Sequence, residues 1–170
     1  MDEAVNNLVG TFGLAVGDAV NAAVAEVAGH AGAMAAGVSY LYQEPDCGIE
    51  DLRAPLGLSQ PAAVRLVNQL VEAGLARRAD DERDARRVCV RLTERGRALA
   101  RRILAARREA VDRMLGPLSE RDQRLLTDLV STMLAGVTAD RADAERLCRL
   151  CDVPACGACP VEAAVPDDAA

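Results

Sequence analysis

A chain of 170 residues can build one sizeable hydrophobic core, or one domain with an appendage, and its near lack of aromatic residues favours packed helices over a sheet sandwich. It has no run of 18 apolar residues and no basic segment near Met1, so we expect neither a membrane span nor a signal peptide, and we expect a cytoplasmic protein. The formal net charge of −6, taken over the whole chain, argues against nucleic-acid binding.

Two helices are predicted at the N-terminal end. Residues 4–28 repeat apolar side chains on one face at helical spacing, and a helix rich in small residues is expected over 31–41. His30 lies at the glycine-containing break between them, and no Ser, Asp or Cys is placed to work with it, so we interpret it as structural. Residues 44–48 are expected to form a loop.

Residues 57–75 predict a short, sharply bounded helix. Ser59 stands at the N-cap, Pro61 lies in the first turn, and Gly74 ends the helix. One face is apolar, and the other has no acid but has amide and guanidinium groups that can read base edges in a major groove. Because a short helix over 49–56 precedes it, the pair is typical of a helix-turn-helix motif. An ordinary amphipathic helix would show the same pattern.

A two-stranded hairpin is predicted directly after Gly74. Residues 75–78 form the first strand and 86–93 the second, with a charged turn over 80–85. The side chains of the second strand expected to point inward are Val88, Val90 and Leu92. Those expected to point outward are Arg87, Cys89 and Arg91. A helix-turn-helix followed by a hairpin is a winged helix, so the predicted fold class is mainly α (α+β) with a two-stranded wing.

Two long helices are predicted after the hairpin. Thr93 caps the first and Ser119 caps the second, which runs to about Thr138. Residues 139–150 are expected to extend the second helix by a turn or two, and residues 160–170 are expected to fray.

Charge is distributed unevenly along the chain. Residues 1–52 hold eight acids and no Arg, residues 53–113 hold fifteen Arg and eight acids, and residues 114–170 hold five Arg and ten acids. The middle segment therefore carries a formal charge of +7 between ends of −8 and −5. A basic lobe on an acidic scaffold is the electrostatic footprint of a DNA-binding domain, although a solvated Arg-rich helix surface accounts for part of it.

Residues 49–100 resemble the MarR family of bacterial transcriptional regulators. The matching segments are Leu56–Pro61, Val64–Val67, Ala73–Leu75, the wing sequence Asp84-Ala85-Arg86 with the alternating Val88 and Val90, and Leu92–Gly96 at the start of the next helix. The resemblance implies a homodimer whose N- and C-terminal helices pair, with two winged-helix lobes on a pseudo-palindromic operator of double-stranded DNA. It also suggests a small-molecule effector.

On this basis we divide the chain into four parts. They are N-terminal dimerisation helices over 1–45, a winged helix-turn-helix lobe over 46–96, C-terminal dimerisation helices over 97–140, and a cysteine-rich tail over 141–170. The apolar stripes on the flanking helices are consistent with dimerisation, because neither helix has enough lobe beside it to cover its stripe. A single closed monomeric core also fits the chain length.

The resemblance assigns DNA contacts to the helix over 57–75. Arg65 is the best candidate for a guanine contact, whereas Ser59, Asn68 and Gln69 would contact phosphate. The remaining groove-facing positions are Gln60, Pro61, Ala62 and Val64.

It also assigns contacts to the wing. Arg86 matches the wing Arg that enters the minor groove, held by Asp84 and flanked by Arg83 and Arg87. The alternative is that Asp84 and Arg86 form a salt bridge within the wing and do not contact DNA.

Four of the six cysteines fall within twelve residues, at Cys148, Cys151, Cys156 and Cys159. Paired CxxC motifs at this density in a cytoplasmic chain indicate a metal or redox site. A four-thiolate zinc site is favoured because it would fold a tail that has almost no core, and an iron–sulfur cluster or reversible disulfides are the alternatives. Arg146 and Arg149 would lower the pKa of these thiols. Cys47 and Cys89 are interpreted as ordinary small residues.

The combined interpretation is a dimeric winged-helix regulator, a repressor, whose DNA affinity responds to a small molecule or to the metal or redox state of its cysteine tail. An enzyme is not expected, because the chain has one His, no glycine-rich phosphate loop and no nucleophile or paired-carboxylate motif. The alternative is a zinc- or iron–sulfur-dependent redox sensor or interaction protein with weak or lost DNA binding.

Overall fold

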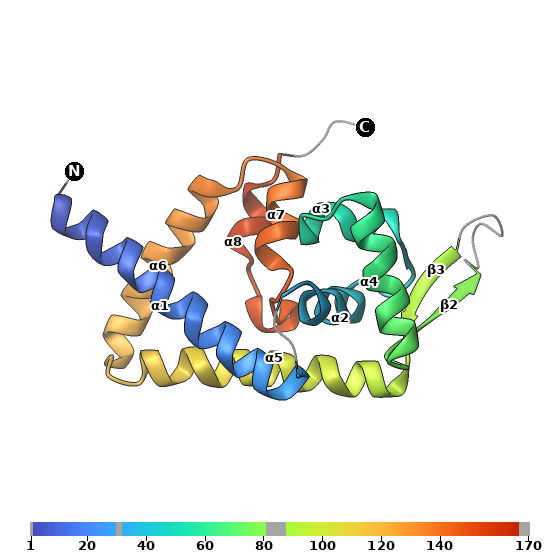
Figure 1. Ribbon diagram of the computed structural model, residues 1–170. Coiled ribbons are helices and arrows are strands. Elements are labelled where there is room, and N and C mark those ends of the chain that lie inside the picture. Colours follow the sequence, from blue (N-terminus) through green and yellow to red (C-terminus); the bar gives the residue numbers. More distant parts are fainter. Residues whose placement is uncertain (1, 30–31, 81–87, 167–170) are drawn as a thin grey trace.

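The structure, a computed structural model, describes residues 2–29, 32–80 and 88–166. It is mainly helical with one small antiparallel sheet, which confirms the predicted fold class (Figure 1). In the described ranges the α-helices are α1 (Glu3–Ala28), α2 (Ala33–Gln43), α3 (Arg53–Leu56), α4 (Gln60–Glu72), α5 (Glu94–Leu115), α6 (Glu120–Val137), α7 (Arg141–Cys148) and α8 (Pro160–Ala164). The strands are β1 (Cys47–Gly48), β2 (Ala76–Asp80) and β3 (Val88–Leu92), and 3-10 turns lie at η1 (Glu50–Leu52) and η2 (Val153–Cys156).

The long helices begin and end where local sequence places them. Thr93 and Ser119 each accept a hydrogen bond from the backbone N–H three residues ahead, at 3.1 and 3.2 Å. α4 ends in a Schellman turn, in which Gly74 has a φ of 67° and the N–H of Leu75 donates to the carbonyl of Leu70 at 2.9 Å. The predicted helix boundaries at Thr93, Ser119 and Gly74 are therefore confirmed.

The sheet has three strands, one more than predicted. β3 lies in the middle, with β2 on one side and β1, expected to be loop, on the other, where Gly48 pairs with Cys89. The inward and outward pattern predicted for β3 is wrong at two positions. Val88 is 48% exposed, whereas Cys89 is fully buried and its thiol donates to the carbonyl of Asp46 at 2.9 Å. The chain around β1 covers a face of β3 that a two-stranded wing would leave in solvent.

The core of the lobe lies between α2, α4, α5 and the sheet. α2 runs through this core, and Ala35–Ser39 are all buried. The small residues of α2 have a packing reason, because a Cβ on Gly37 would lie 3.0 Å from the side chain of Leu66 in α4. The most deeply buried large side chains include Leu41, Leu52, Leu70 and Ile103. This core fixes the orientation of α4.

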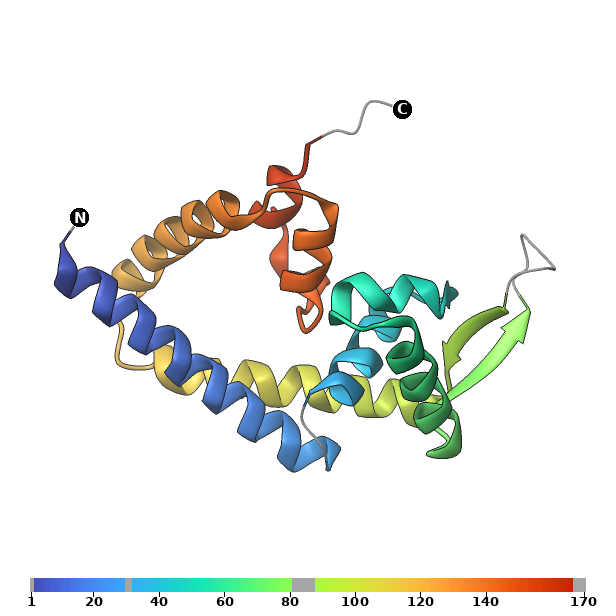
Figure 2. The same ribbon diagram turned by 45° about the horizontal axis from the view of Figure 1, so that its top comes forward.

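An arm made of α1, α6 and the far half of α5 extends away from the lobe (Figures 1 and 2). α1 packs along α5, and its end nearest the lobe joins the core through Val20, Val24 and Val27. The other end of α1 exposes large apolar side chains, as at Leu8 (66%) and Leu14 (73%). The arm therefore presents apolar surface that its own chain leaves uncovered.

Among the described helices, α1 alone has the length and apolar character of a membrane span, with a mean hydropathy of 1.5 over 18 residues. The sequence analysis expected no membrane span because the chain has no uninterrupted run of 18 apolar residues. α1 has no such run either, since Asp18 and polar residues interrupt its apolar residues. Length and composition do not distinguish a spanning helix from a helix whose apolar face is covered by protein.

The C-terminal tail is folded and does not continue α6. The chain turns at Thr138, and Asp140 caps the separate helix α7 by accepting a hydrogen bond from the N–H of Asp143 at 2.8 Å. The predicted extension of α6 over 139–150 is therefore wrong, because a local cap at Asp140 starts a new helix in a new direction.

The prediction that 160–170 fray is wrong over Pro160–Ala164, which form α8. Val161 is buried there, and α8 packs against α6. Arg141 of α7 donates to both carboxylate oxygens of Glu162 in α8, at 2.7 and 2.9 Å. Tertiary contacts of the tail, rather than its composition, hold this segment in place. Residues 167–170 lie outside the described ranges.

Candidate nucleic-acid interface

The outer face of α4 is polar and carries no acid before Glu72. The residues predicted to face DNA share this surface: Ser59, Gln60, Pro61, Val64, Arg65, Asn68 and Gln69 are exposed, and Ala62 is half-buried. The opposite face is buried in the core through Ala63, Leu66, Val67 and Leu70. Because packing fixes one face and the Schellman turn fixes the C-terminal end, the polar side chains project from one rigid surface.

The N-terminal end of α4 is open to an anionic group. Ser59 has the extended backbone of an N-cap, with φ −70° and ψ 158°, but its hydroxyl forms no capping hydrogen bond. The first N–H groups of a helix have no acceptor within the helix, and they point along the helix axis toward any phosphate bound there. Ser59 therefore occupies the predicted N-cap position, but its side chain does not accept a hydrogen bond from the first N–H groups of α4.

An arginine of β2, Arg78, lies beside the α4 surface. Arg77 and Arg78 are exposed, and a guanidinium N–H of Arg78 donates to the side-chain carbonyl of Asn68 at 2.6 Å. Asn68 is thereby tied to the wing through its side-chain oxygen, whereas the predicted phosphate contact would use its side-chain N–H groups. The signal for Arg77 and Arg78 is present in the sequence, as two adjacent basic residues on the first wing strand, but only the packing of β2 on α4 shows where they lie.

The tip of the wing falls outside the described residues. Arg83, Asp84, Arg86 and Arg87 belong to the segment over 81–87, between the end of β2 and the start of β3. Their predicted roles, and the alternative of a salt bridge within the wing, stay predictions.

The four tail cysteines lie near one another at the junction of α7, η2 and α8. Cys148 ends α7, Cys156 ends η2, and Cys159 caps α8, where its sulfur accepts a hydrogen bond from the N–H of Glu162 at 3.5 Å. Burial raises the pKa of Cys148 to about 12, and hydrogen bonds and charge interactions with Cys151 and Cys159 add to this effect. Cys148 and Cys159 also line the same cavity.

The pKa values of Cys148 and Cys156 are raised, whereas Arg146 and Arg149 were predicted to lower them. Arg146 forms an ion pair with Asp143 at 2.6 Å, and Arg149 donates to the carbonyl of Arg146. The pKa of Cys156 is raised, first by partial burial and then by Cys151 and Cys159, with Arg107 of α5 opposing the rise. Burial and neighbouring sulfurs outweigh the arginines.

The thiols are close together, but they do not form a ready coordination shell. Within residues 2–29, 32–80 and 88–166, no three His, Cys, Asp or Glu side chains are arranged to hold a metal ion. The predicted zinc, iron–sulfur and disulfide chemistries of Cys148, Cys151, Cys156 and Cys159 all stay predictions.

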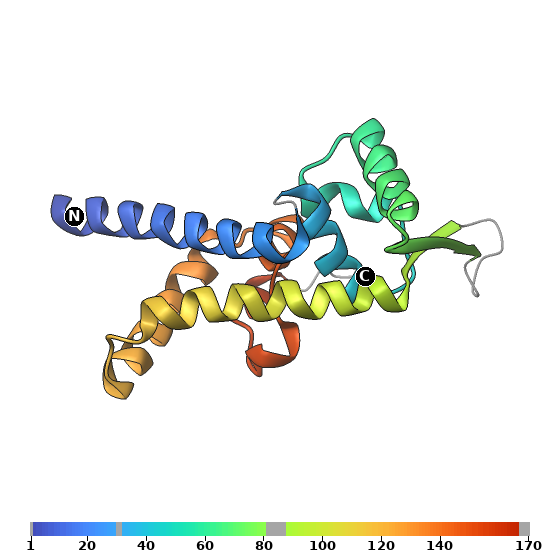
Figure 3. The ribbon, with the colours of Figure 1, turned by 60° about the horizontal axis from the view of Figure 1, so that its bottom comes forward.

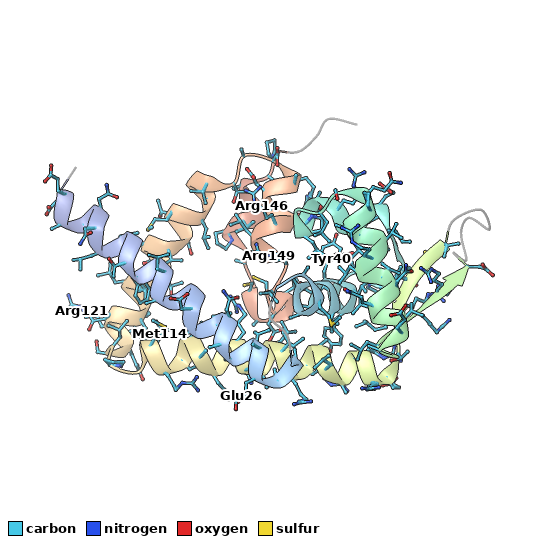
Figure 4. All side chains as sticks on the ribbon, in the orientation of Figure 1. Glu26, Tyr40, Met114, Arg121, Arg146 and Arg149 are labelled. Carbon is cyan, nitrogen blue, oxygen red and sulfur yellow. The ribbon has the colours of Figure 1, made fainter. Side chains whose placement is uncertain are left out.

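The segment between the first two tail cysteines is docked on the lobe, which the sequence analysis missed. Leu150 packs against the hydrophobic core, and α7 packs against α3 of the helix-turn-helix. Arg149 and Leu150 line a small cavity of about 240 Å³ together with Val24 of α1, Ala35 of α2 and Leu56 of α3. Figure 4 shows Arg146 and Arg149 in the middle of the molecule, between α6 and the lobe. A single apolar residue between two cysteines carries no sequence signal for this docking.

Two cavities of about 390 and 380 Å³ meet at Tyr40 of α2, Glu44 and Glu145 of α7. Burial, followed by the nearby charge of Glu145, raises the pKa of Tyr40 above its usual value. The pKa of Glu145 is also raised, mainly by burial. These cavities lie between the lobe and the tail, and the second of them also reaches Cys148 and Cys159.

A family model described as MarR family matches residues 38–87. Among curated proteins, the chain is 25% identical over 93 residues to YwhA of Bacillus subtilis (strain 168), an uncharacterized HTH-type transcriptional regulator. This match covers 55% of the chain and 67% of YwhA.

Solved structures share the fold. Rv1404 of Mycobacterium tuberculosis matches with a TM-score of 0.69 and 19% identity, over 78% of this chain and 92% of that one. The MarR family protein Rv2887 of M. tuberculosis, in complex with salicylic acid, matches with a TM-score of 0.58 and 26% identity, over 74% and 93%. Its complex with DNA matches with a TM-score of 0.61 and 24% identity, over 75% and 95%. These matches leave about a quarter of this chain without a counterpart.

Proposed function

Because the chain belongs to the MarR family of winged helix-turn-helix transcriptional regulators, we propose that it represses transcription as a homodimer bound to a pseudo-palindromic DNA operator. It is a regulator of this type and not an enzyme. The observation that carries the proposal is the acid-free surface of α4 beside Arg78 of β2. Since its target is chromosomal DNA, we place the protein in the cytoplasm.

The α4 surface divides into base-reading and phosphate-binding positions. Arg65 projects from its exposed face, and a guanidinium can pair with O6 and N7 of guanine in the major groove. Ser59 and the open N-terminal end of α4 suit a phosphate. Arg78, held beside Asn68, adds a positive charge at the edge of the same surface.

The remaining predicted contacts complete this surface. Gln60 and Gln69 offer amides, Ala62 and Val64 offer apolar contact to a thymine methyl group, and Pro61 shapes the first turn. Arg86, held by Asp84 and flanked by Arg83 and Arg87, would enter the minor groove and read its width.

The apolar arm provides the dimer interface in this proposal. No residue of α6 is fully buried against its own chain, and the large apolar side chains exposed along it are Leu125, Leu129, Val130, Met133 and Val137. A monomer rarely leaves so much contiguous apolar surface in water. Figure 3 shows α1 projecting from the lobe alongside α5 and α6, so a second copy could pair with the whole arm. Sedimentation equilibrium should give the mass of a dimer, and Leu129→Arg should give that of a monomer.

Fluorescence anisotropy with duplex DNA tests the DNA-binding proposal. Non-cognate duplex should bind more weakly as salt is raised, because the protein displaces counterions from phosphates. Arg65→Ala should lose discrimination between a duplex enriched by in vitro selection and a scrambled one, by about 1–3 kcal/mol. Arg108→Ala, which removes an exposed charge from α5, is the control and should discriminate as the wild type does. Absence of salt-dependent binding would exclude the proposal.

We further propose that DNA affinity responds to an effector, either a small molecule or the state of the tail cysteines. The cavities at Tyr40 lie between the lobe and the tail, where an occupant would contact both. The relative Rv2887 has been solved with salicylic acid. The cysteine cluster supports a second candidate function, a metal- or redox-dependent sensor with weak or lost DNA binding. The same anisotropy titration separates the two.

A further inference from the structure

We propose that Leu150 is a positioning residue for operator recognition. By docking the tail on the lobe, it sets how the lobe is held relative to the arm, and thereby the spacing at which the two α4 helices of a dimer meet DNA. The inference rests on the proposed function, because it requires a dimer that binds two half-sites. Leu150 itself contacts no DNA and acts only through the position of α3 and α4.

α6 packs against its own chain mainly through the tail. Among the described elements, α8 alone makes more than marginal contact with α6. The chain leaves α6 at Thr138, which is buried and whose hydroxyl donates to the carbonyl of Leu134 at 2.8 Å. Asp140 then accepts from the N–H of Asp143 at 2.8 Å, and the carboxylate of Asp143 accepts from the N–H of Ala139 at 3.2 Å. These contacts fix the direction in which α7 leaves the end of α6.

The other side of the tail is docked on the lobe. α7 packs against α3, and Ala144 of α7 is buried. Two residues beyond α7, Leu150 packs on the core, where it lines the cavity of about 240 Å³ with Val24 of α1 and Leu56 of α3. Leu150 is therefore the apolar side chain that joins the tail to the point where the arm meets the lobe.

The turn between α3 and α4 makes the two helices one unit. The N–H of Gly57 donates to the carbonyl of Ala54 at 3.2 Å, and the N–H of Leu58 donates to the carbonyl of Arg53 at 2.9 Å. Gly57 has a φ of 62°, a left-handed conformation that glycine adopts without steric cost. A contact that holds α3 therefore also holds the orientation of α4.

The tail gives the lobe a second attachment to the arm. α5 runs from the lobe into the arm along one side, and the tail lies between α6 and α3 on the other (Figures 1 and 2). A long helix bends, so α5 alone lets the lobe rock, whereas a second attachment away from α5 restricts that motion. Gln60, Arg65 and Gln69 stay exposed with the tail docked, so the tail does not block the α4 surface. It acts as a brace, because reading helices held at one separation lose less freedom on binding two half-sites.

Anisotropy titrations with duplexes of different half-site spacing test this role. The set contains the duplex enriched by in vitro selection, versions with its half-sites moved by one or two base pairs, and a duplex with one half-site scrambled. The wild type should prefer the selected spacing. Leu150→Ala should lose about tenfold on the selected duplex, stay within about twofold of the wild type on the single half-site, and discriminate less among spacings.

Two matched variants accompany Leu150→Ala. Val153→Ala truncates an apolar side chain of the tail that is 54% exposed, and it should keep the wild-type spacing profile. Leu150→Met retains the volume and apolar character of the docked side chain and should keep that profile too. The positioning role is excluded if Leu150→Ala keeps the wild-type profile, or if it weakens the single half-site as much as the selected duplex.

Amide hydrogen exchange on the DNA-free protein tests the docking itself. Leu150→Ala should speed exchange about tenfold over 141–148 and in α3, but not in the far half of α5. Unchanged exchange would show that Leu150 does not hold the tail on the lobe, and it would overturn the inference while leaving the proposed function intact. A wild type that binds no duplex, or that gains nothing from a second half-site, would overturn the proposed function and the positioning role with it.

Discussion

The winged-helix lobe and the cysteine tail are ordered by different means within one chain. The lobe buries a continuous set of large side chains, such as Leu41, Leu70 and Ile103, between α2, α4, α5 and a three-stranded sheet. The tail buries Ala144 and Val161 in its helices, and it is otherwise held by the Arg141–Glu162 ion pair and by the packing of α7 on α3 and of α8 on α6. The lobe and the tail therefore owe their order to different contacts.

The difference matters for function because stability is not uniform across a structure. A segment with few buried apolar contacts opens locally at low cost, so a ligand that binds it can shift its population. The α4 surface, backed by the core, should hold its shape whether or not the tail is docked. Substitutions in the two regions should therefore have different kinds of effect as well as different sizes.

Gly96→Ala should give the largest loss of stability, and it falls in the lobe. A Cβ at Gly96 would lie 2.0 Å from the carbonyl oxygen of Leu75, so α5 and the start of β2 would have to move apart. We expect a loss of about 4 kcal/mol in the free energy of unfolding, measured by urea denaturation. Gly116→Ala, at the other end of α5, meets only ordinary contacts at 3.6 Å and should be neutral or slightly stabilising. Equal effects would contradict the packing argument.

Leu70→Ala and Val161→Ala compare burial in the two regions. Leu70 is fully buried in the lobe, and its truncation should lower the free energy of unfolding by about 3 kcal/mol. Val161 is 4% exposed, but it belongs to the tail, so Val161→Ala should speed amide exchange over 141–164 and leave the global urea midpoint almost unchanged. A matching drop in midpoint for both variants would show that the tail is part of the cooperative core.

Arg78→Ala tests whether the lobe surface extends from α4 onto the wing. Removing the guanidinium beside Asn68 should weaken binding to any duplex by about tenfold and reduce the salt slope by about one. Anisotropy titrations at several salt concentrations measure both quantities, with Arg108→Ala as the matched charge control. An unchanged salt slope would confine the interface to α4 and the wing tip.

Acidification should give the smallest effect, and it should be limited to the tail. The hydrogen-bonded guanidinium of Arg141 lowers the pKa of Glu162, so the ion pair stabilises the tail above the ordinary pKa of the carboxyl group. This stabilisation is lost as pH falls through the lowered value, below about pH 4. Limited proteolysis of residues 141–164 should become faster below this pH in the wild type. Glu162→Gln, which lacks the carboxylate, should already be cleaved at this faster rate at higher pH. Because the pair is exposed, the change should be modest.

Local sequence was sufficient for the helix boundaries at Thr93, Ser119 and Gly74, for the helix-turn-helix and for the polar face of α4. Thr93, Ser119 and Gly74 act on backbone groups within a few residues of themselves, so their roles can be seen without knowing the fold. Helical spacing places Arg65 and Gln60 opposite Leu66 and Leu70 for the same reason.

Long-range contacts decided the rest. Cys89 is inside because β1, some forty residues earlier, pairs with β3, and no alternation within one strand reveals a third strand. Asn68 meets Arg78 because the core packs β2 against α4. Leu150 docks on the lobe because the chain turns at Thr138 and brings the tail back across the molecule. The sequence by itself determined that a helix with a polar, acid-free face and a cluster of four cysteines exist, and only the tertiary structure decided what each of them packs against.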